Sequence, residues 1–281
     1  MSAVHTGVSV RDALDGAVTA IAASGSQTPR LDAELLLADA MGTTRERLFS
    51  DPGATVEGPA VRAFQTHVRR RAGTREPVAY IVGRRAFRRL VLAVDGRVLV
   101  PRPETELIVE LAVEMLEPGA AVLDCCCGGG AIALALADER PDLRVSGSDL
   151  DAGALAVARA NSERLGLSVA WHQADLLDGL GEHLDAIVAN PPYVESDAIA
   201  ALEPEVGQHE PRLALDGGAD GLGVLSRLIV QAARTPVRLL ILEHGEGQAA
   251  ALAERCALAG YAEVEHHDDL AGIARAVVAR R

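Results

Sequence analysis

The sequence predicts an α/β protein in which a helical N-terminal module precedes a doubly wound, mostly parallel sheet. Helical and strand signals alternate after Pro103, and apolar residues recur at helical spacing through roughly the first 75 residues. Charge also divides the chain: 14 Arg and 10 acidic residues precede position 101, whereas 13 Arg and 30 acidic residues follow it, giving net charges of +4 and −17. This asymmetry indicates two modules.

Apolar periodicity predicts four helices in the first module. They cover residues 10–24, residues 29–41, a short stretch after Thr43, and residues 59–72. Proline occupies a first-turn position of the second and the fourth, and glycine follows the ends of the first, second and fourth. Thr43 and Glu46 have the spacing of a capping box, which predicts where the short helix starts.

Short β-like runs separate the two modules. They cover residues 78–82, 90–94 and 98–100, and Asp95-Gly96 is a turn signal. We therefore expect a hairpin-like linker here.

The second module alternates between strands and helices. Strands are expected at residues 121–124, 144–149, 168–175, 185–189 and 237–243, and helices at 104–116, 131–140 and 152–165. Residues 262–266 and 272–278 flank Asp268-Asp269, and strands joined this closely can pair only antiparallel. This pattern predicts a parallel sheet that ends with an antiparallel strand.

Composition narrows the function classes. The 281 residues are 49% hydrophobic, which is ample for a core, and the net charge of −13 disfavours a broad nucleic-acid-binding surface. No run of 18 apolar residues and no signal-peptide pattern occurs. Three of the four cysteines are consecutive and cannot supply a disulfide framework. We expect a cytoplasmic protein that acts on a small molecule or a protein.

The first candidate site follows the strand at residues 121–124. Asp124 ends this strand, and the small residues from Cys125 to Gly130 open a helix, which allows a ligand to approach the backbone closely. Alone, this pattern fits a tight strand-to-helix turn equally well. Asp149 ends the next strand about 20 residues later, where a carboxylate can accept hydrogen bonds from ribose hydroxyls. The pair indicates a nucleotide-like cofactor.

Asp175 ends the third strand. Asp175 or its neighbour Leu176 could meet the adenine of such a cofactor, although a loop carboxylate is the simpler interpretation of Asp175 alone.

The more specific candidate is Asn190-Pro191-Pro192-Tyr193, directly after an apolar strand. The two prolines fix the backbone, so the Pro191 carbonyl and the Asn190 side-chain oxygen can present two fixed acceptors to a planar NH2 group. Accepting both hydrogens raises the electron density on a nitrogen that is otherwise a poor nucleophile. Tyr193 can stack on the planar group.

These residues resemble the class I S-adenosylmethionine-dependent methyltransferases, and within them the HemK/PrmC protein-glutamine methyltransferases that modify peptide chain release factors. The resemblance covers nearly the whole chain. The stretches that carry it are residues 29–36, 75–83, 98–106 (Val-Leu-Val-Pro-Arg-Pro-Glu-Thr-Glu), 190–193, 203–222, and 239–243 with Gln248.

The resemblance implies a helical substrate-docking domain at residues 1–76, a β-hairpin linker at 77–100 and a seven-stranded, Rossmann-like methyltransferase domain at 101–281. It implies methyl transfer from S-adenosyl-L-methionine to the side-chain amide nitrogen of the Gln in the Gly-Gly-Gln loop of class I release factors, in translation termination. Asn190, Pro191 and Tyr193 would be catalytic, and Asn190 to Tyr193 would hold the substrate. The implied cofactor contacts are Asp124, Cys126, Cys127, Gly128, Gly129, Gly130, Asp149, Asp175, Leu176 and Asn190.

The turn after Asp124 departs from the family pattern Asp-x-Gly-Thr-Gly-Ser-Gly. Cys126 replaces the first Gly, Cys127 the Thr and Gly129 the Ser. A positive φ at Cys126 costs about 1 kcal/mol or more. A metal or redox site at the three cysteines lacks a second Cys pair or a suitably spaced His, so we expect no metal.

Two alternative functions stay open at this stage. An amino-group methyltransferase acting on adenine would also need Asn-Pro-Pro-Tyr, and a non-catalytic release-factor-binding module would tolerate a degenerate cofactor turn. Nine Arg between residues 62 and 89 could steer an acidic partner or form a solvated face. We expect a monomer that binds neither a membrane nor nucleic acid directly.

Overall fold

The computed structural model describes residues 7–180 and 183–281. The chain forms two compact units: one runs to Gly83 and also includes Glu203–His209, and the other comprises Arg84–Leu202 and Glu210–Arg281. Among the described residues, none of the helices has both the length and the apolar character that a membrane span requires. Below, the unit that runs to Gly83 and includes Glu203–His209 is called the helical unit, and the other is called the α/β unit.

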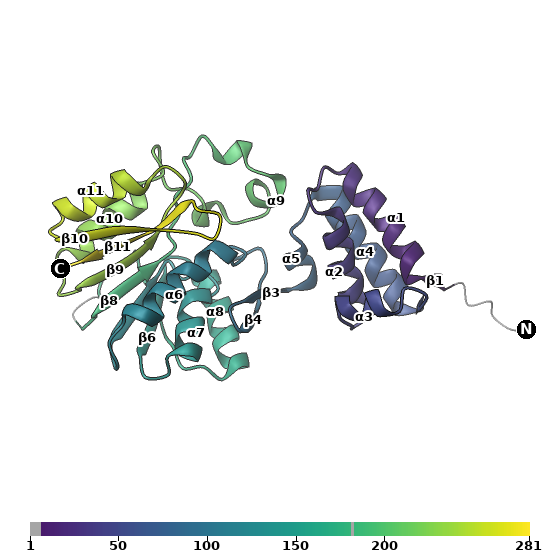
Figure 1. Cartoon of the computed structure of the whole chain (residues 1–281), viewed down its shortest axis with the longest axis horizontal. Helices are drawn as coiled ribbons and strands as arrows, with labels where there is room; N and C mark the ends of the chain where they lie inside the picture. The colour runs from purple at the N-terminus through teal and green to yellow at the C-terminus, as the bar shows by residue number, and fades with distance from the viewer. Residues whose placement is uncertain (1–6, 181–182) are drawn as a thin grey trace, which may run out of the picture. The chain divides into compact units, whose positions relative to one another are not determined.

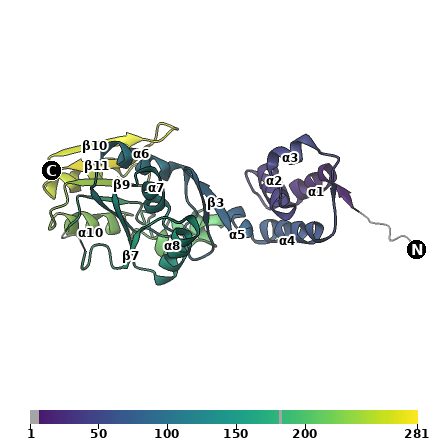
Figure 2. The same ribbon diagram turned by 90° about the horizontal axis from the view of Figure 1, so that it is seen from below.

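The helical unit is built around one apolar core (Figures 1 and 2). Its largest fully buried side chains include Ile21, Leu36 and Leu37, and the ring of Phe64 joins them. Its elements are β1 (Val8–Ser9), α1 (Val10–Ala23), α2 (Pro29–Ala40), α3 (Arg45–Ser50), β2 (Thr55–Val56), α4 (Pro59–Thr74), α5 (Val78–Val82) and, from the distant segment, α9 (Pro204–Gly207).

Two helix boundaries differ from the sequence prediction. The N-cap of α3 is Thr44, whose hydroxyl accepts from the Arg47 N–H, and not Thr43. Helix α4 continues through Gly73 to Thr74, and its C-cap Arg75 adopts a left-handed conformation with a φ of 56°. The Arg75 side chain makes tertiary ion pairs, and these hold the helix end where a local glycine signal predicts a stop.

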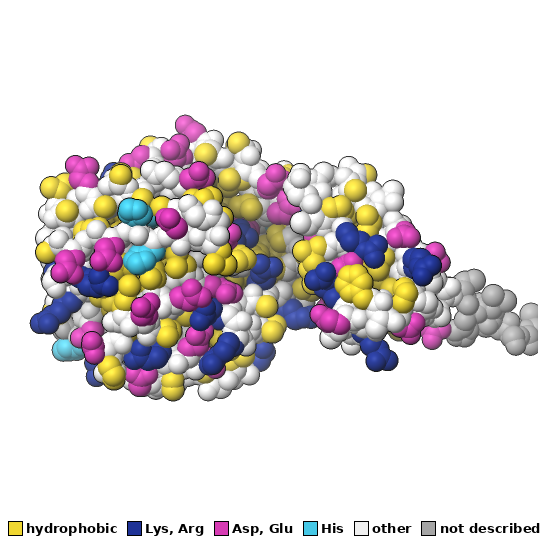
Figure 3. Space-filling model, viewed as in Figure 1, with side chains coloured by type: hydrophobic (Ala, Val, Ile, Leu, Met, Phe, Trp, Pro, Cys, Tyr) yellow, Lys and Arg dark blue, Asp and Glu magenta, His cyan; other side chains and the backbone are white. Residues whose placement is uncertain are grey.

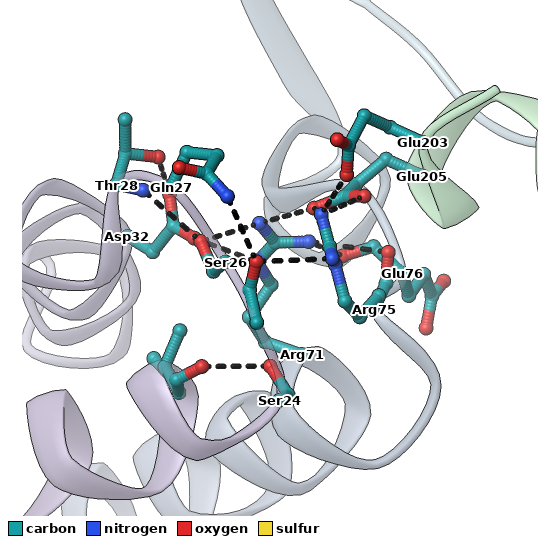
Figure 4. Close-up of polar contacts among 12 residues, drawn as sticks. Ser24, Ser26, Gln27, Thr28, Asp32, Arg71, Arg75, Glu76, Glu203 and Glu205 are labelled. Carbon is teal, nitrogen blue, oxygen red and sulfur yellow. Dashed lines mark hydrogen bonds and ion pairs between the residues drawn. The ribbon is translucent and has the colours of Figure 1, made fainter.

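A buried charge network organises the helical unit (Figure 4). The carboxylate of Asp32, 5% exposed, accepts from the Arg71 Nε at 2.7 Å and from the hydroxyls of Ser26 and Thr28 at 2.8 and 2.9 Å. Arg71 is 4% exposed. A buried carboxylate is tolerated only when its charge and lone pairs are satisfied, and here one cation and two hydroxyls do so.

The same network holds the segment Glu203–His209, which is far away in sequence (Figure 4). Glu205 pairs with Arg71 at 2.6 Å and with Arg75 at 2.7 Å, and Glu203 pairs with Arg75 at 2.6 Å. Desolvation is the largest single influence and raises the pKa of Glu205. The hydrogen bonds from Arg75 and Arg71, together with a backbone hydrogen bond, outweigh it, so the pKa of Glu205 is lowered overall. No local sequence pattern predicts this long-range pairing.

The Arg-rich stretch is not a free basic face. At least five of its nine arginines are ion-paired: Arg70 with Glu76, Arg71 with Asp32 and Glu205, Arg75 with Glu203 and Glu205, Arg88 with Glu110 and Glu139, and Arg89 with Asp138. All of these acidic partners except Glu76 lie outside the stretch, and they offset much of the charge that the local count suggested.

The α/β unit contains the predicted seven-stranded sheet. The strands are β5 (Ala121–Cys125), β6 (Arg144–Asp149), β7 (Ala170–Gln173), β8 (Ala186–Ala189), β9 (Leu239–Glu243), β10 (Glu263–Asp268) and β11 (Ala274–Arg280), in the spatial order β10-β11-β9-β8-β5-β6-β7. Among the described strands of this sheet, β11 alone runs in the reverse direction: it pairs antiparallel with β9 and β10, and the other pairs are parallel. This arrangement confirms the predicted fold class, including the antiparallel pairing of the last two strands.

Helices cover both faces of the sheet (Figures 1 and 2). Successive residues of β5 and β8 alternate between two apolar layers, as the strand pleat requires. One layer includes α6 (Glu106–Met115) and α7 (Ala131–Glu139) and is flanked by α8 (Ala152–Leu165); the other includes α10 (Gly223–Ala232) and α11 (Ala249–Leu258). Helices α10 and α11 are not among the elements predicted from the sequence.

The hairpin differs from its prediction. Strands β3 (Arg84–Phe87) and β4 (Leu90–Ala93) pair through a turn at Arg88-Arg89, not at Asp95-Gly96, and residues 98–100 form no strand. The Glu106 carboxylate accepts from the Arg88 N–H at 2.9 Å, which fixes this turn by a tertiary contact.

Residues 78–82 form helix α5 and not a strand. Gly83 follows α5 with a φ of 70°, a left-handed conformation that ends a helix. An apolar run of five residues does not distinguish a strand from one turn of buried helix, so the local pattern was insufficient here.

Candidate active site

A cavity opens at the carboxyl ends of the parallel strands, where the chain order reverses between β5 and β8. Doubly wound sheets bind ligands at this switch point. The cavity has about 1190 Å³ of empty space including its open mouth, and the walls come from the turn after β5, the ends of β6 and β8, and residues 97–105 and 211–227.

The turn after β5 is tightly wound. Cys126, Gly128 and Gly130 have φ values of 63°, 52° and 84°, and the Gly130 N–H donates to the Cys127 carbonyl at 2.8 Å. The strain foreseen for a non-glycine residue at position 126 is therefore present. A Cβ on Gly128, which lines the cavity, would meet no atom within 4 Å, so the backbone here is open to a ligand.

Trp171, the single Trp of the chain, packs behind this turn. A Cβ on Gly130 would lie 2.7 Å from the Trp171 ring, and a Cβ on Gly147 would lie 2.4 Å from it. The Trp171 ring therefore needs glycine at both positions.

Asp124 lies at the bottom of the cavity and is 1% exposed. One carboxylate oxygen accepts from the Ala133 N–H at 3.0 Å, and the other is buried without a hydrogen-bond partner among the described residues. Burial raises the pKa of Asp124 to about 8. This unmet acceptor points to a ligand donor or to a retained proton.

Asp149 ends β6 at the cavity wall. Its two oxygens accept from the N–H groups of Gly128 at 2.8 Å and Asp151 at 2.9 Å, which fix the carboxylate in place. Burial raises the pKa of Asp149, although these backbone bonds oppose the shift. Each oxygen keeps a second lone pair, so the group can still accept from a pair of hydroxyls.

Asp175 and Leu176 also line the cavity. Arg227, another wall residue, pairs with Asp175 at 2.5 Å, while Leu176 is buried with a φ of 57°. Arg227 thus engages Asp175, and Leu176 supplies an apolar surface at this part of the wall.

The Asn190–Tyr193 motif follows β8. The amide nitrogen of Asn190 donates to the Thr105 hydroxyl at 3.0 Å, and Asn190 and Pro192 line the cavity. Pro191 is buried beside it. The Tyr193 side chain lies outside the cavity wall and packs partly against the second apolar layer, where its hydroxyl donates to Glu243 at 3.2 Å. Desolvation, the main cause, raises the pKa of Tyr193.

Distant glycines and a glutamine clamp the end of this motif. The Gln248 side chain donates to the Tyr193 carbonyl at 3.0 Å. A Cβ on Gly217 would lie 2.8 Å from the Tyr193 Cα, and a Cβ on Gly221 would lie 2.4 Å from the Tyr193 carbonyl oxygen. Backbone therefore packs on backbone here, which explains why glycine is required at both positions.

The cavity unites most, but not all, of the predicted site residues. Those that line it are Asp124, Cys126, Cys127, Gly128, Gly129, Asp149, Asp175, Leu176, Asn190 and Pro192. Gly130, Pro191 and Tyr193 do not. Other residues also line the cavity although no local sequence motif marks them as ligand contacts, among them Arg97, Leu150, Asp151, Leu213 and Arg227.

Comparison with known proteins agrees with this geometry. Residues 12–83 match the PrmC N-terminal domain, and residues 104–218 match the methyltransferase small domain. Release factor glutamine methyltransferases match over nearly the full length: that of Caulobacter vibrioides is 39% identical over 91% of this chain and 90% of its own. The chain belongs to the release factor glutamine methyltransferase family. The relative from Moorella thermoacetica is 40% identical over 98% of this chain and 99% of its own.

Two solved structures are similar to this chain in fold. The catalytic domain of hMettl16 in complex with an RNA hairpin aligns with a TM-score of 0.56 at 16% identity, covering 81% of this chain and 84% of that one. A methyltransferase from Pyrococcus furiosus aligns with a TM-score of 0.51 at 18% identity, covering 67% of this chain and 87% of that one.

S-adenosyl-L-methionine is the cofactor of this methyltransferase family, and the cavity residues fit it. The exposed backbone at Gly128, the fixed Asp149 carboxylate and the buried, unpartnered oxygen of Asp124 provide contacts for a polar, positively charged nucleoside. Within the described part of the chain, no group of three or more His, Cys, Asp and Glu could hold a metal ion.

Proposed function

We propose that this protein transfers a methyl group from S-adenosyl-L-methionine to the side-chain amide nitrogen of the Gln in the Gly-Gly-Gln loop of class I peptide chain release factors. The observation that carries the proposal is the Asn190–Tyr193 motif at the mouth of a cofactor-sized cavity, in a chain that matches release factor glutamine methyltransferases over nearly its full length.

Two acceptors would hold the substrate amide. The Asn190 side-chain oxygen and the Pro191 carbonyl would each accept one hydrogen of the NH2 group, which orients the nitrogen lone pair. Stacking of Tyr193 on the amide stays a prediction, because its hydroxyl is turned toward Glu243.

The reaction needs orientation more than acid–base catalysis. The cofactor supplies a methyl group on a positively charged sulfur, the nitrogen–carbon bond forms as the sulfur–carbon bond breaks, and the excess proton leaves the amide nitrogen for solvent. The cavity residues contribute by fixing the two reacting groups in line.

We propose that the helical domain, residues 1–76, docks the release factor, with residues 77–100 as its linker. An apolar depression between α1 and α4 supports this role; it is lined by Val8, Ala13, Val61, Phe64 and Val68, among others. Figure 3 shows hydrophobic side chains on the surface of this unit. We further propose that the enzyme is cytoplasmic and monomeric. Light scattering of the purified protein tests the monomeric state.

The deciding experiment offers radiolabelled S-adenosylmethionine with three acceptors: a release factor, its Gln-to-Ala loop variant and an oligonucleotide containing adenine. We expect label only on the wild-type factor. Label on the oligonucleotide would favour an adenine methyltransferase. If the protein binds the release factor but neither binds the cofactor nor transfers label, it is a non-catalytic binding module.

A further inference from the structure

Two segments that are distant in sequence hold the backbone at the end of the proposed substrate-binding motif. The Tyr193 carbonyl accepts a hydrogen bond from the side-chain nitrogen of Gln248 at 3.0 Å. The next residue, Val194, donates its N–H to the Leu215 carbonyl at 2.9 Å, and its carbonyl accepts from the Gly217 N–H at 2.8 Å. All of these residues belong to the α/β unit. Tertiary hydrogen bonds therefore fix the end of the motif.

The Gln248 amide satisfies its two partners in one orientation only. The Gly245 N–H donates to its oxygen at 2.8 Å, and its nitrogen donates to the Tyr193 carbonyl at 3.0 Å. A backbone N–H only donates and a backbone carbonyl only accepts, so an amide turned over would lose both bonds. The backbone N–H of Gln248 also donates to the Gly245 carbonyl at 3.2 Å, just before α11 begins. Gln248 thus ties a closed turn to Tyr193.

The surrounding glycines leave this amide little room to move. A Cβ on Gly221 would lie 2.6 Å from the Gln248 nitrogen, which is too close for any side chain. A Cβ on Gly245 would lie 3.1 Å from the Gln248 oxygen and 3.2 Å from the Tyr193 ring. Two glycine backbones therefore enclose the amide and keep it against Tyr193.

The tie matters because the two prolines of the motif cannot anchor themselves. Pro191 and Pro192 have no N–H, and their rings fix φ but not ψ, so the surroundings must set the remaining backbone angles. Asn190 and Pro192, on either side of Pro191, line the cavity. Asn190 directly follows β8, which holds one end of this segment. The bond from Gln248 to the Tyr193 carbonyl holds the other end.

We propose that Gln248 is a positioning residue that keeps the Pro191 carbonyl directed at the acceptor amide by fixing the Tyr193 carbonyl. This inference rests on the proposed function and deepens it, because Gln248 lies outside the cavity wall and acts through Tyr193. It gives one role to three segments that are far apart in sequence: the exit of β8, residues 215–221 and the turn before α11.

Two substitutions at position 248 test the proposal. Gln248→Glu has nearly the same shape, and its ionised carboxylate can still accept from Gly245 but places an oxygen against the Tyr193 carbonyl. Gln248→Met removes both bonds. We expect each variant to lower kcat for release factor methylation about 10-fold, because a partly buried carbonyl loses its donor. The KM for the release factor should change less than kcat. The Kd of S-adenosyl-L-methionine, measured by calorimetry, should keep its wild-type value.

The pH dependence of Gln248→Glu separates positioning from structural support. In this variant a protonated carboxyl can donate to the Tyr193 carbonyl as the native amide does, whereas an ionised one cannot. A carboxyl that faces a carbonyl oxygen has a raised pKa. The ratio of variant to wild-type kcat should therefore be highest at the lowest pH at which the wild-type enzyme turns over, and it should fall as pH rises. Wild-type rates at each pH correct for the native charged and titratable groups on the surrounding segments, among them Asp216, Asp220, Glu243, His244, Glu246 and Arg255.

Ala257→Glu is the matched control for charge. It adds a carboxylate at an exposed position of the same helix, α11, so kcat and its pH dependence should stay at their wild-type values.

The outcomes distinguish this inference from the proposed function. A wild-type enzyme that methylates no release factor overturns the proposed function itself. The positioning role alone is overturned if the wild-type enzyme is active and both variants at position 248 keep its kcat, if they lose kcat and cofactor affinity together, or if the kcat ratio of Gln248→Glu does not change with pH. If Gln248→Met fails to fold, the pH dependence of Gln248→Glu decides the matter.

Discussion

Asp32 of the helical unit and Asp124 and Glu243 of the α/β unit are all buried carboxylates, but their surroundings differ. Asp32 of the helical unit meets the Arg71 guanidinium at 2.7 Å and two hydroxyls. Among the described residues, Asp124 and Glu243 of the α/β unit have no ion-pair partner; the first accepts from a backbone N–H and the second from the Tyr193 hydroxyl. The first arrangement satisfies both the hydrogen bonds and the charge, whereas the second leaves one oxygen of each carboxylate buried without a hydrogen-bond partner among the described residues.

This difference distinguishes a carboxylate that supports the fold from carboxylates that can take part in chemistry. A buried carboxylate balanced by arginine fixes the packing of its neighbours, and breaking such a pair leaves an uncompensated charge. Without a cation, burial raises the pKa of Glu243 to about 7 and that of Asp124 to about 8, so both can exchange protons near neutral pH. Such groups occur preferentially at functional sites.

The largest effect is expected when Arg71 is removed. Arg71→Met leaves Asp32 buried without its cation, which should lower the free energy of unfolding of the helical unit by about 3–5 kcal/mol. Denaturant unfolding followed by circular dichroism measures this loss, and Trp171 fluorescence follows the α/β unit in the same sample. Arg69→Met, at an exposed position, is the matched control. Equal stability of the two variants would show that the network is dispensable.

Removing a functional acceptor should instead spare stability. Asn190→Ala deletes one of the two oxygens proposed to hold the substrate amide, so kcat should fall about 100-fold or more, a typical loss for one preorganised polar group in an active site. Steady-state methylation measures the rate and thermal unfolding checks the fold. A wild-type rate would contradict the proposed mechanism.

The α/β carboxylates should also make stability depend on pH. Burial raises the folded-state pKa of Asp124 to about 8, whereas an unfolded Asp ionises near pH ~4. The folded protein therefore holds an extra proton between these values, and the free energy of unfolding should fall as pH rises from about 5 to 8. Asp124→Asn should make this slope shallower without abolishing it, because Glu243 contributes in the same direction. Unfolding curves at four pH values test this, and an unchanged slope would refute it.

The smallest effect concerns backbone strain, where the two units again differ. Cys126 and Arg75 both have positive φ values, but the Arg75 side chain makes two ion pairs. Cys126→Gly should raise the free energy of unfolding by about 1 kcal/mol by relieving strain. Arg75→Gly should lower it because the ion pairs are lost. Thermal unfolding of both variants compares the signs; a gain for Arg75→Gly would mean that strain outweighs its pairing.

Local sequence patterns were sufficient where the hydrophobic periodicity of an element and the residues at its boundaries predict the same structure. The strand from Arg144 to Asp149 and the helix starts at Pro29 and Pro59 were predicted as they occur. They were insufficient for the short run at residues 78–82 and for the hairpin turn at Arg88-Arg89. There the outcome depends on Gly83 and Glu106, through helix termination and a tertiary hydrogen bond.

By itself, the sequence determined the fold class, the family, and the strand ends that carry Asp124, Asp149 and Asn190, because hydrophobic periodicity and short motifs are local properties of a chain. Only the tertiary structure decided the partners of these groups. It turned Tyr193 toward Glu243, placed Thr105 behind Asn190 and paired Arg71 with Asp32. Burial and hydrogen bonding depend on segments distant in sequence, and they set which carboxylates support the fold and which can take part in chemistry.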